Sequence, residues 1–178
     1  MTLPSGIRTH VERSRIVGFE LCSRYGIEHD PVDLAILAHD LFRSSSRFDL
    51  LNEAYARGWE PDPIECTEPM LLHGPLAGLW LLQEAGVDSL DVIDAVMWHT
   101  TYGPGLGATA AVVFLADKLD PHKIKERPWL DLVLDSCLKN SLASAIELYL
   151  SKMSKILVDT GRQVHPRMIE AMNSLRTK

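Results

Sequence analysis

Apolar residues recur along most of this chain with the three- and four-residue spacing of helices that bury one face. Stretches rich in glycine, proline or serine separate these segments. No run alternates apolar and polar residues as a strand does, and no segment repeats. We therefore expect an all-α fold. The pattern predicts helices over residues 8–25, 32–42, 50–56, 69–85, 89–100 and 108–119, a long helical segment over 129–160, and a short final helix from Pro166.

The predicted helix over residues 32–42 differs from the others because it is apolar on nearly every side. Asp30-Pro31, directly before it, is a helix start signal, with aspartate as the N-cap and proline at the first helical position. A helix without a polar face is buried by its neighbours on all sides. We therefore place this helix in the centre of a bundle.

The chain has 178 residues and no break in composition, so we expect a single domain over residues 1–178. Hydrophobic residues make up 46% and charged residues 24%, which is typical of a soluble globular protein. The formal charge of −6 argues against a nucleic-acid or membrane partner. An anionic small substrate remains open, because bound cations add local positive charge that a sequence count misses.

The three cysteines, Cys22, Cys66 and Cys137, are widely spaced and form no CxxC pair. They are typical of reduced thiols in a cytosolic protein. The first residues lack the continuous apolar core of a signal peptide, and no stretch reaches the roughly 18 apolar residues of a membrane span. We therefore expect a cytoplasmic protein.

One aspartate lies in an otherwise apolar run, DLAILAHDL, where it follows a histidine as the pair His39-Asp40. A carboxylate removed from water without a partner costs several kcal/mol, so a buried aspartate is normally paired or bound to a metal. His39 shares a helical face with Ile36 and Val32, three and seven residues earlier. The pair is therefore predicted to lie at the core, with a partner there.

Other polar residues lie on apolar helical faces in the same way. A single inward histidine is more often satisfied by a backbone carbonyl than by a metal, and for His10, on the least apolar helix, that interpretation alone would be favoured. The whole set favours metal, because each group would otherwise need its own partner. The candidate metal ligands are His10, His39, Asp40, His73, His99 and Asp117.

These ligand types suit iron, manganese, zinc or a similar divalent ion. Six ligands are enough for two ions, and Asp40 is the natural bridge because its neighbour His39 holds one ion at the same point of the chain. Two metals roughly 3.5–4 Å apart form a clamp for in-line displacement at phosphorus, in which a metal-activated water attacks. The predicted chemistry is hydrolysis of a phosphate ester or anhydride, at a site within about residues 8–120, with a C-terminal helical portion over about 121–178.

In this order, the residues resemble those of the HD-domain metal-dependent phosphohydrolases, whose pattern is His, His-Asp, two His and Asp. The resemblance spans nearly the whole chain and narrows to the YqeK-like branch of bacterial HD proteins. The His-Asp dipeptide alone is weak, whereas the ordered set is specific. The segments that carry it are THVERSRIVGFELCSRYG, LAILAHDL, LLHGPLAG, HTTYGPGL, VVFLADKLDP and a late VHP.

The resemblance implies an HD-domain helical bundle with a buried, binuclear, di-iron-type centre and the symmetrical hydrolysis of diadenosine tetraphosphate to two ADP. Iron is favoured, with manganese or another divalent ion as alternatives. By the same resemblance, all six candidate ligands would hold the metals. The implied partner is a nucleotide substrate, and the exposed apolar residues of the C-terminal region leave room for a homodimer.

Two places depart from the family pattern. Arg43 stands where a lysine is usual, and its wider, planar group meets phosphate differently. In the Gly- and Pro-rich loop over 101–107, Tyr102 and Gly103 replace a glycine and an arginine, which would put a bulky ring at the mouth of the site. The expected substrate contacts are Arg43, Thr100, Tyr102 and Lys118. His29, His122 and His165 are expected to be surface or structural residues.

Two alternative functions remain open because of this loop. One is an HD phosphohydrolase that acts on a mononucleotide or another phosphate ester. The other is a non-catalytic metal- and nucleotide-binding module, for which the missing loop arginine is the support. The complete set of candidate ligands weighs against the second alternative.

Overall fold

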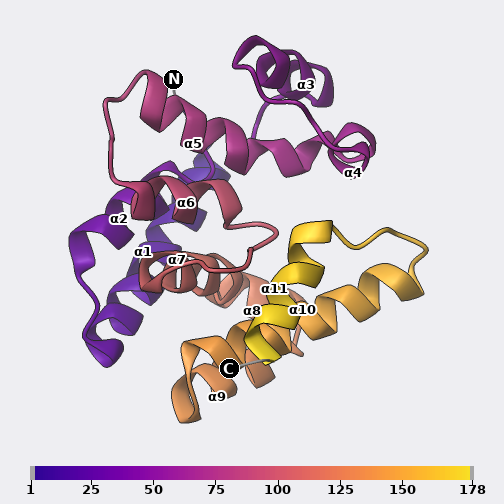
Figure 1. The fold of residues 1–178 in the computed structure, drawn as a ribbon. Helices are drawn as coiled ribbons and strands as arrows, with labels where there is room; N and C mark the ends of the chain where they lie inside the picture. Colours follow the sequence, from indigo (N-terminus) through magenta and orange to yellow (C-terminus); the bar gives the residue numbers. More distant parts are fainter. Residues whose placement is uncertain (1–2, 177–178) are drawn as a thin grey trace.

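The computed structural model describes residues 3–176, which are helical with no strand among them (Figure 1). The expected all-α fold is confirmed. The helices are α1 (Ser5–Tyr25), α2 (His29–Ala38), α3 (Arg47–Ala56), α4 (Pro63–Thr67), the 3-10 helix η1 (Pro69–Leu72), α5 (His73–Gln83), α6 (Leu90–Trp98), α7 (Ala108–Lys118), α8 (Pro121–Glu126), α9 (Leu130–Lys139), α10 (Leu142–Asp159) and α11 (Pro166–Arg176).

The apolar helix α2 lies where its composition predicts, packed against α1, α5, α6 and α7. Its predicted end at residue 42 is wrong, because the α-helix stops at Ala38. The chain then tightens into a turn, in which the backbone N–H of Leu41 donates to Ala38 and that of Arg43 to Asp40. Bonds to the third residue back replace bonds to the fourth, which is the tighter 3-10 pattern. His39 and Asp40 therefore lie in a turn and not within a regular helix.

Other predicted boundaries also differ from the structure, including the start of α2, which is at His29 and not after an Asp30 N-cap. The segment over 58–69, expected to be a connector, contains α4, which begins with a capping box made by Asp62 and Glu65. The stretch over 69–85 opens with η1 before α5 starts. The long segment over 129–160 is divided between α9 and α10, where Ser141 caps the second helix. The caps at Asp62 and Ser141 are local side-chain chemistry that overrides the helical period.

The C-terminal helices extend the apolar core of the N-terminal ones. Figure 1 shows them in orange to yellow, gathered on one side of the bundle, and α10 packs directly against α7. Buried residues from both parts, such as Phe114 on α7 and Leu150 on α10, belong to one apolar cluster. None of the helices in residues 3–176 has the length and apolar composition needed to cross a bilayer.

Glycine allows α5 and α6 to approach closely. A Cβ placed on Gly74 would lie 2.6 Å from the backbone oxygen of Met97 and 3.2 Å from Cε1 of His99. We expect Gly74→Ala to lower the free energy of unfolding by about 2–3 kcal/mol, because a backbone carbonyl cannot move aside as a side chain can. Urea unfolding would measure this. Gly6→Ala is the matched control, since its Cβ would meet nothing within 4 Å, and an equal loss in both variants would contradict the prediction.

Candidate metal centre and substrate cavity

The structure brings all six candidate ligands together in the core. His10 comes from α1, His39 and Asp40 from the turn after α2, His73 from the start of α5, His99 from the end of α6 and Asp117 from α7. Each is at most 9% exposed. Two overlapping groups have ligand atoms within 4.8 Å of one another. These groups are His10 with His39 and Asp117, and His39 with Asp40 and His99.

Asp40 lies at the centre of this cluster. Its Oδ2 is 3.6 Å from Nε2 of His39 and 3.9 Å from Nε2 of His10. Its Oδ1 is 3.3 Å from Nε2 of His73 and 3.8 Å from Nε2 of His99. Each carboxylate oxygen therefore faces two imidazoles, and this is the arrangement that a bridging carboxylate needs.

The outer nitrogen of each histidine is held by an acceptor. Nδ1 of His39 bonds to the carbonyl of Ile36 at 2.7 Å, and Nδ1 of His99 bonds to that of Val96 at 2.7 Å. Nδ1 of His73 contacts the carbonyl of Met70 in the same way. Carbonyls only accept, so these rings must carry their proton on Nδ1. Their Nε2 atoms then carry lone pairs, and each lies 3.3–3.8 Å from an oxygen of Asp40.

These lone pairs are better suited to binding a metal ion than to facing one another. Nε2 of His39 is fully buried and has no hydrogen-bond partner among the described residues. Nε2 of His73 and Nε2 of His99 lie 2.9 Å apart, although the tautomer argument leaves neither of them a proton to donate. A cation between them would stabilise buried lone pairs that face one another in this way. The donor set is the imidazole and carboxylate mixture of divalent transition metals.

The protonation states of three candidate ligands, His39, His99 and Asp117, favour the same interpretation. Burial lowers the pKa of His39 and that of His99, so both imidazoles are neutral at pH 7. Burial acts to raise the pKa of Asp117, but the charges of Lys118 and Lys123 outweigh it and keep that pKa well below its usual range. Metal ligands must be deprotonated, and these residues are deprotonated near neutral pH.

Asp120 supports His10 through Nδ1 of the imidazole ring, a role that was not predicted from the sequence. Its Oδ2 lies 2.7 Å from Nδ1 of His10, and Arg13 donates two hydrogen bonds to its carboxylate at 2.6 and 2.8 Å. Asp120 is 1% exposed, and its pKa is lowered to about 2 because hydrogen bonds from Arg13 and His10 outweigh its burial. A carboxylate behind a histidine fixes the ring and strengthens it as a ligand.

We expect Asp120→Asn to weaken metal binding by about 10- to 100-fold, the usual effect of removing such a support. The amide keeps the shape of the side chain but loses the charge that holds the His10 ring. Titration with Mn²⁺ would measure the change. Asp131→Asn, at an exposed position on α9, is the control. An unchanged affinity in Asp120→Asn would contradict the prediction.

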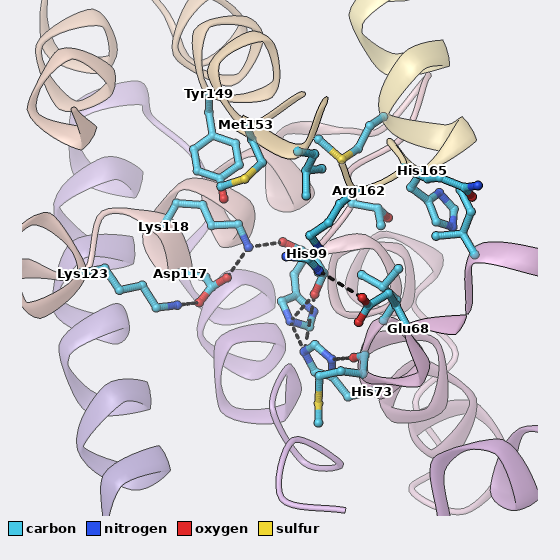
Figure 2. Close-up of a pocket in the computed structure, with 18 of the residues that line it drawn as sticks. Glu68, His73, His99, Asp117, Lys118, Lys123, Tyr149, Met153, Arg162 and His165 are labelled. Carbon is cyan, nitrogen blue, oxygen red and sulfur yellow. Dashed lines mark hydrogen bonds and ion pairs between the residues drawn. The ribbon is translucent and has the colours of Figure 1, made fainter. Parts of the chain in front are cut away.

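A cavity of about 570 Å³ opens onto this cluster, between the N-terminal helices and the segment from α10 to α11 (Figure 2). Asp40, His73, His99 and Asp117 form one wall. The volume is in the range of ligand-binding pockets. Five Lys and Arg residues line it against four Asp and Glu, so the cavity is not acidic although the chain is. The basic residues are Arg43, Lys118, Lys123, Arg127 and Arg162.

Three of the four expected substrate contacts lie at this cavity: Arg43, Thr100 and Lys118. Oγ1 of Thr100 is 3.1 Å from Nε2 of His99. Lys118 is 8% exposed and donates to the carbonyl of His99 at 2.9 Å and to Asp117 at 2.5 Å. Lys118 therefore braces a candidate ligand as well as lining the cavity.

The structure places Tyr102 elsewhere than expected. It is 5% exposed, does not line the cavity, and packs with its ring centroid 5.0 Å from that of Phe114. Its φ of 60° lies in the left-handed region, which is uncommon for residues other than glycine. Burial raises the pKa of its hydroxyl to about 12. The tyrosine therefore adds no bulk at the cavity mouth.

Several cavity residues come from the polar C-terminal half and were not predicted from the sequence. Lys123, Arg127 and Arg162 are spaced like ordinary surface charges, and only the fold turns them to the cavity. His165, expected to be surface or structural, is 5% exposed, lines the cavity and has Nε2 at 3.1 Å from Oδ2 of Asp62. The VHP motif around His165 was the available signal for this position.

The fold has a solved counterpart. It superimposes with a TM-score of 0.88 on a protein from Clostridium acetobutylicum described as a predicted HD superfamily hydrolase involved in NAD metabolism. The two share 22% sequence identity, over 95% of this chain and 88% of that one. The two proteins therefore share one all-α fold, as expected.

Curated relatives narrow the comparison. Proteins from Bacillus subtilis and Halalkalibacterium halodurans, both named symmetrical bis(5'-nucleosyl)-tetraphosphatase, are each 25% identical to this chain. The first match covers 79% of this chain and 78% of the relative, and the second covers 85% and 83%. A Staphylococcus aureus protein of the same name is 22% identical over 96% of this chain and 87% of its own length. No family model matches the chain. The expected resemblance is confirmed.

Proposed function

We propose that this protein is a metal-dependent phosphohydrolase that cleaves diadenosine tetraphosphate, or a related dinucleoside polyphosphate, symmetrically into two ADP. The observation that carries the proposal is the convergence of four imidazoles and two carboxylates in one buried cluster, of which Asp40, His73, His99 and Asp117 line a cavity that also has five basic residues. The named activity of three relatives, each matched over more than three quarters of its length, supports the choice of substrate.

The two sides of Asp40 suggest how two metal ions would be held. His10, His39 and Asp117 would hold one ion and His73 and His99 the other, and Asp40, which lies within 3.9 Å of all four imidazoles, would contribute to both. Iron is our first choice, with manganese or another divalent ion able to use the same ligands. When bound, such a pair supplies Lewis-acid chemistry that acidifies water and offsets charge on phosphoryl oxygens.

The rest of the cavity would bind and orient the substrate. Arg43 and Arg162 lie at the cavity, where their guanidinium groups can pair with phosphate oxygens. Leu71, Leu157 and Met168 give the same cavity an apolar wall that can cover a nucleoside. Lys118 fixes Asp117 in place through its hydrogen bond, so the orientation of that carboxylate does not depend on substrate. Fixed charges of this kind lower a barrier without reorganisation during the reaction.

The test is to purify the protein with its native metal, measure metal per chain, and incubate it with diadenosine tetraphosphate. Two metal ions per chain and ADP as the sole product, resolved by chromatography, are expected. Two metals without cleavage would reject this substrate, and a panel of mononucleotides and phosphate esters would then identify another. Nucleotide binding without any product at full metal occupancy would favour the non-catalytic module.

A further inference from the structure

Lys123 on α8 is the residue that the proposed function leaves unexplained. Its ammonium contacts Oδ1 of Asp117 and lies 3.4 Å from Nε2 of His10. These two residues, with His39, form one of the groups that could hold a metal ion. Figure 2 shows Lys123 and Lys118 reaching Asp117 from different directions. The ammonium of Lys123 therefore meets the same atoms that a metal ion at this end of the centre would use.

An ammonium and a divalent cation cannot share these atoms. At a separation of about 3–4 Å two positive charges repel strongly wherever water is partly excluded, as it is here. Lys118 avoids this conflict because it uses the other oxygen, Oδ2, and has a second acceptor in the carbonyl of His99. Lys123 has no such anchor, and its side chain is 34% exposed. Lys123 is therefore the lysine that must move when a metal binds.

The position of α8 indicates where Lys123 would go. The residue lines the 570 Å³ cavity together with Arg127, one helical turn further along the chain. It also lines a smaller hollow of about 470 Å³ beside α1, where Arg13 is paired with Asp120 and where Glu126, which lines the cavity too, is the other acidic residue. The cavity is the side that would receive phosphate in the proposed function. A lysine displaced there would meet substrate oxygens together with Arg127.

We propose that Lys123 has two positions: it competes with a metal ion for Asp117 and His10, and once displaced it becomes a phosphate contact at the cavity wall. The proposal rests on the proposed function for the identity of the phosphate ligand. It does not depend on turnover, because both contacts can be measured as binding. Metal binding would thereby move the ammonium of Lys123 toward the substrate phosphate.

The first test is calorimetric titration of Mn²⁺ into Lys123→Met without nucleotide. Removing the competing ammonium is expected to tighten Mn²⁺ binding about tenfold, the worth of one charge-assisted hydrogen bond. Lys125→Met is the matched control, because that lysine is exposed on the same short helix and does not line the cavity. Unchanged or weaker Mn²⁺ binding in Lys123→Met overturns the competition. Lys123→Gln provides a second neutral variant in case the first folds poorly.

The second test is the affinity for ADP at saturating Mn²⁺. Lys123→Met is expected to bind ADP about tenfold more weakly, whereas Lys123→Arg keeps the charge and most of the affinity. If Lys123 only supported the fold, its substitution would weaken Mn²⁺ binding and ADP binding together. That result would contradict the proposal. Unchanged ADP affinity in Lys123→Met overturns the phosphate contact. Failure of the wild type to cleave diadenosine tetraphosphate would reject the proposed function and leave both results valid.

Discussion

Replacing Asp40 with asparagine is expected to lower kcat for diadenosine tetraphosphate about a thousandfold, the upper range for losing one preorganised charge in an active site. The same change is expected to leave at most one metal ion per chain. Both oxygens of Asp40 face pairs of imidazoles, at distances of 3.3 to 3.9 Å. The amide keeps this shape but carries no charge, and its nitrogen cannot act as a metal ligand. Product chromatography and elemental analysis would measure the two losses.

The control for this variant is Asp30→Asn. Asp30 lies on α2, the helix that leads into the turn with Asp40, but its carboxylate is fully exposed. It is expected to keep wild-type metal content and turnover. Circular dichroism should show equal helix content in the two variants, since the side chain of Asp40 makes no backbone hydrogen bond in the described structure. Full metal-dependent turnover in Asp40→Asn would contradict the assignment of the centre.

The candidate ligands could be predicted because buried helical faces appear in the sequence as apolar residues at three- and four-residue spacing. His99 and Asp117 each continue an apolar stripe, and a stripe identifies the face that packs. Helical spacing alone did not explain the His39-Asp40 pair, since adjacent residues on a helix point about 100° apart. The structure resolves this difficulty, because α2 ends at Ala38 and the turn that follows presents both side chains to one site.

The missed residues depend on contacts between distant parts of the chain. Asp120 has the sequence signature of an N-cap before Pro121, and it does cap α8, where it accepts from the backbone N–H of His122. Its second role requires α1 to lie beside it, which no local pattern records. Arg162 faces the cavity only because α10 packs on α7. Tyr102 was misplaced for a different reason, a left-handed backbone that is rare for residues other than glycine.

Metal is also expected to stabilise the fold. Six side chains from five separate segments would be joined by the ions, and the unfolded chain offers no such site. Free Mn²⁺ at a hundred times its Kd adds about 2.7 kcal/mol to the free energy of unfolding for each ion bound. For a chain of this length, each bound ion therefore corresponds to a rise in Tm of about 5–10 °C. Thermal unfolding of chelator-treated protein, with and without added Mn²⁺, would measure the shift.

Asp40→Asn provides the decisive comparison, because it removes the bridging charge and leaves the surrounding packing in place. Its Tm should rise by no more than about half as much as that of the wild type, since at most one ion can still bind. Mg²⁺ should have a weaker effect than Mn²⁺ because it prefers oxygen ligands, and four of the six candidate ligands are imidazoles. Equal shifts in the wild type and Asp40→Asn would mean that Mn²⁺ binds elsewhere on the chain. The cluster around Asp40 would then be a network of hydrogen bonds only, and the proposed hydrolysis would lose its physical basis.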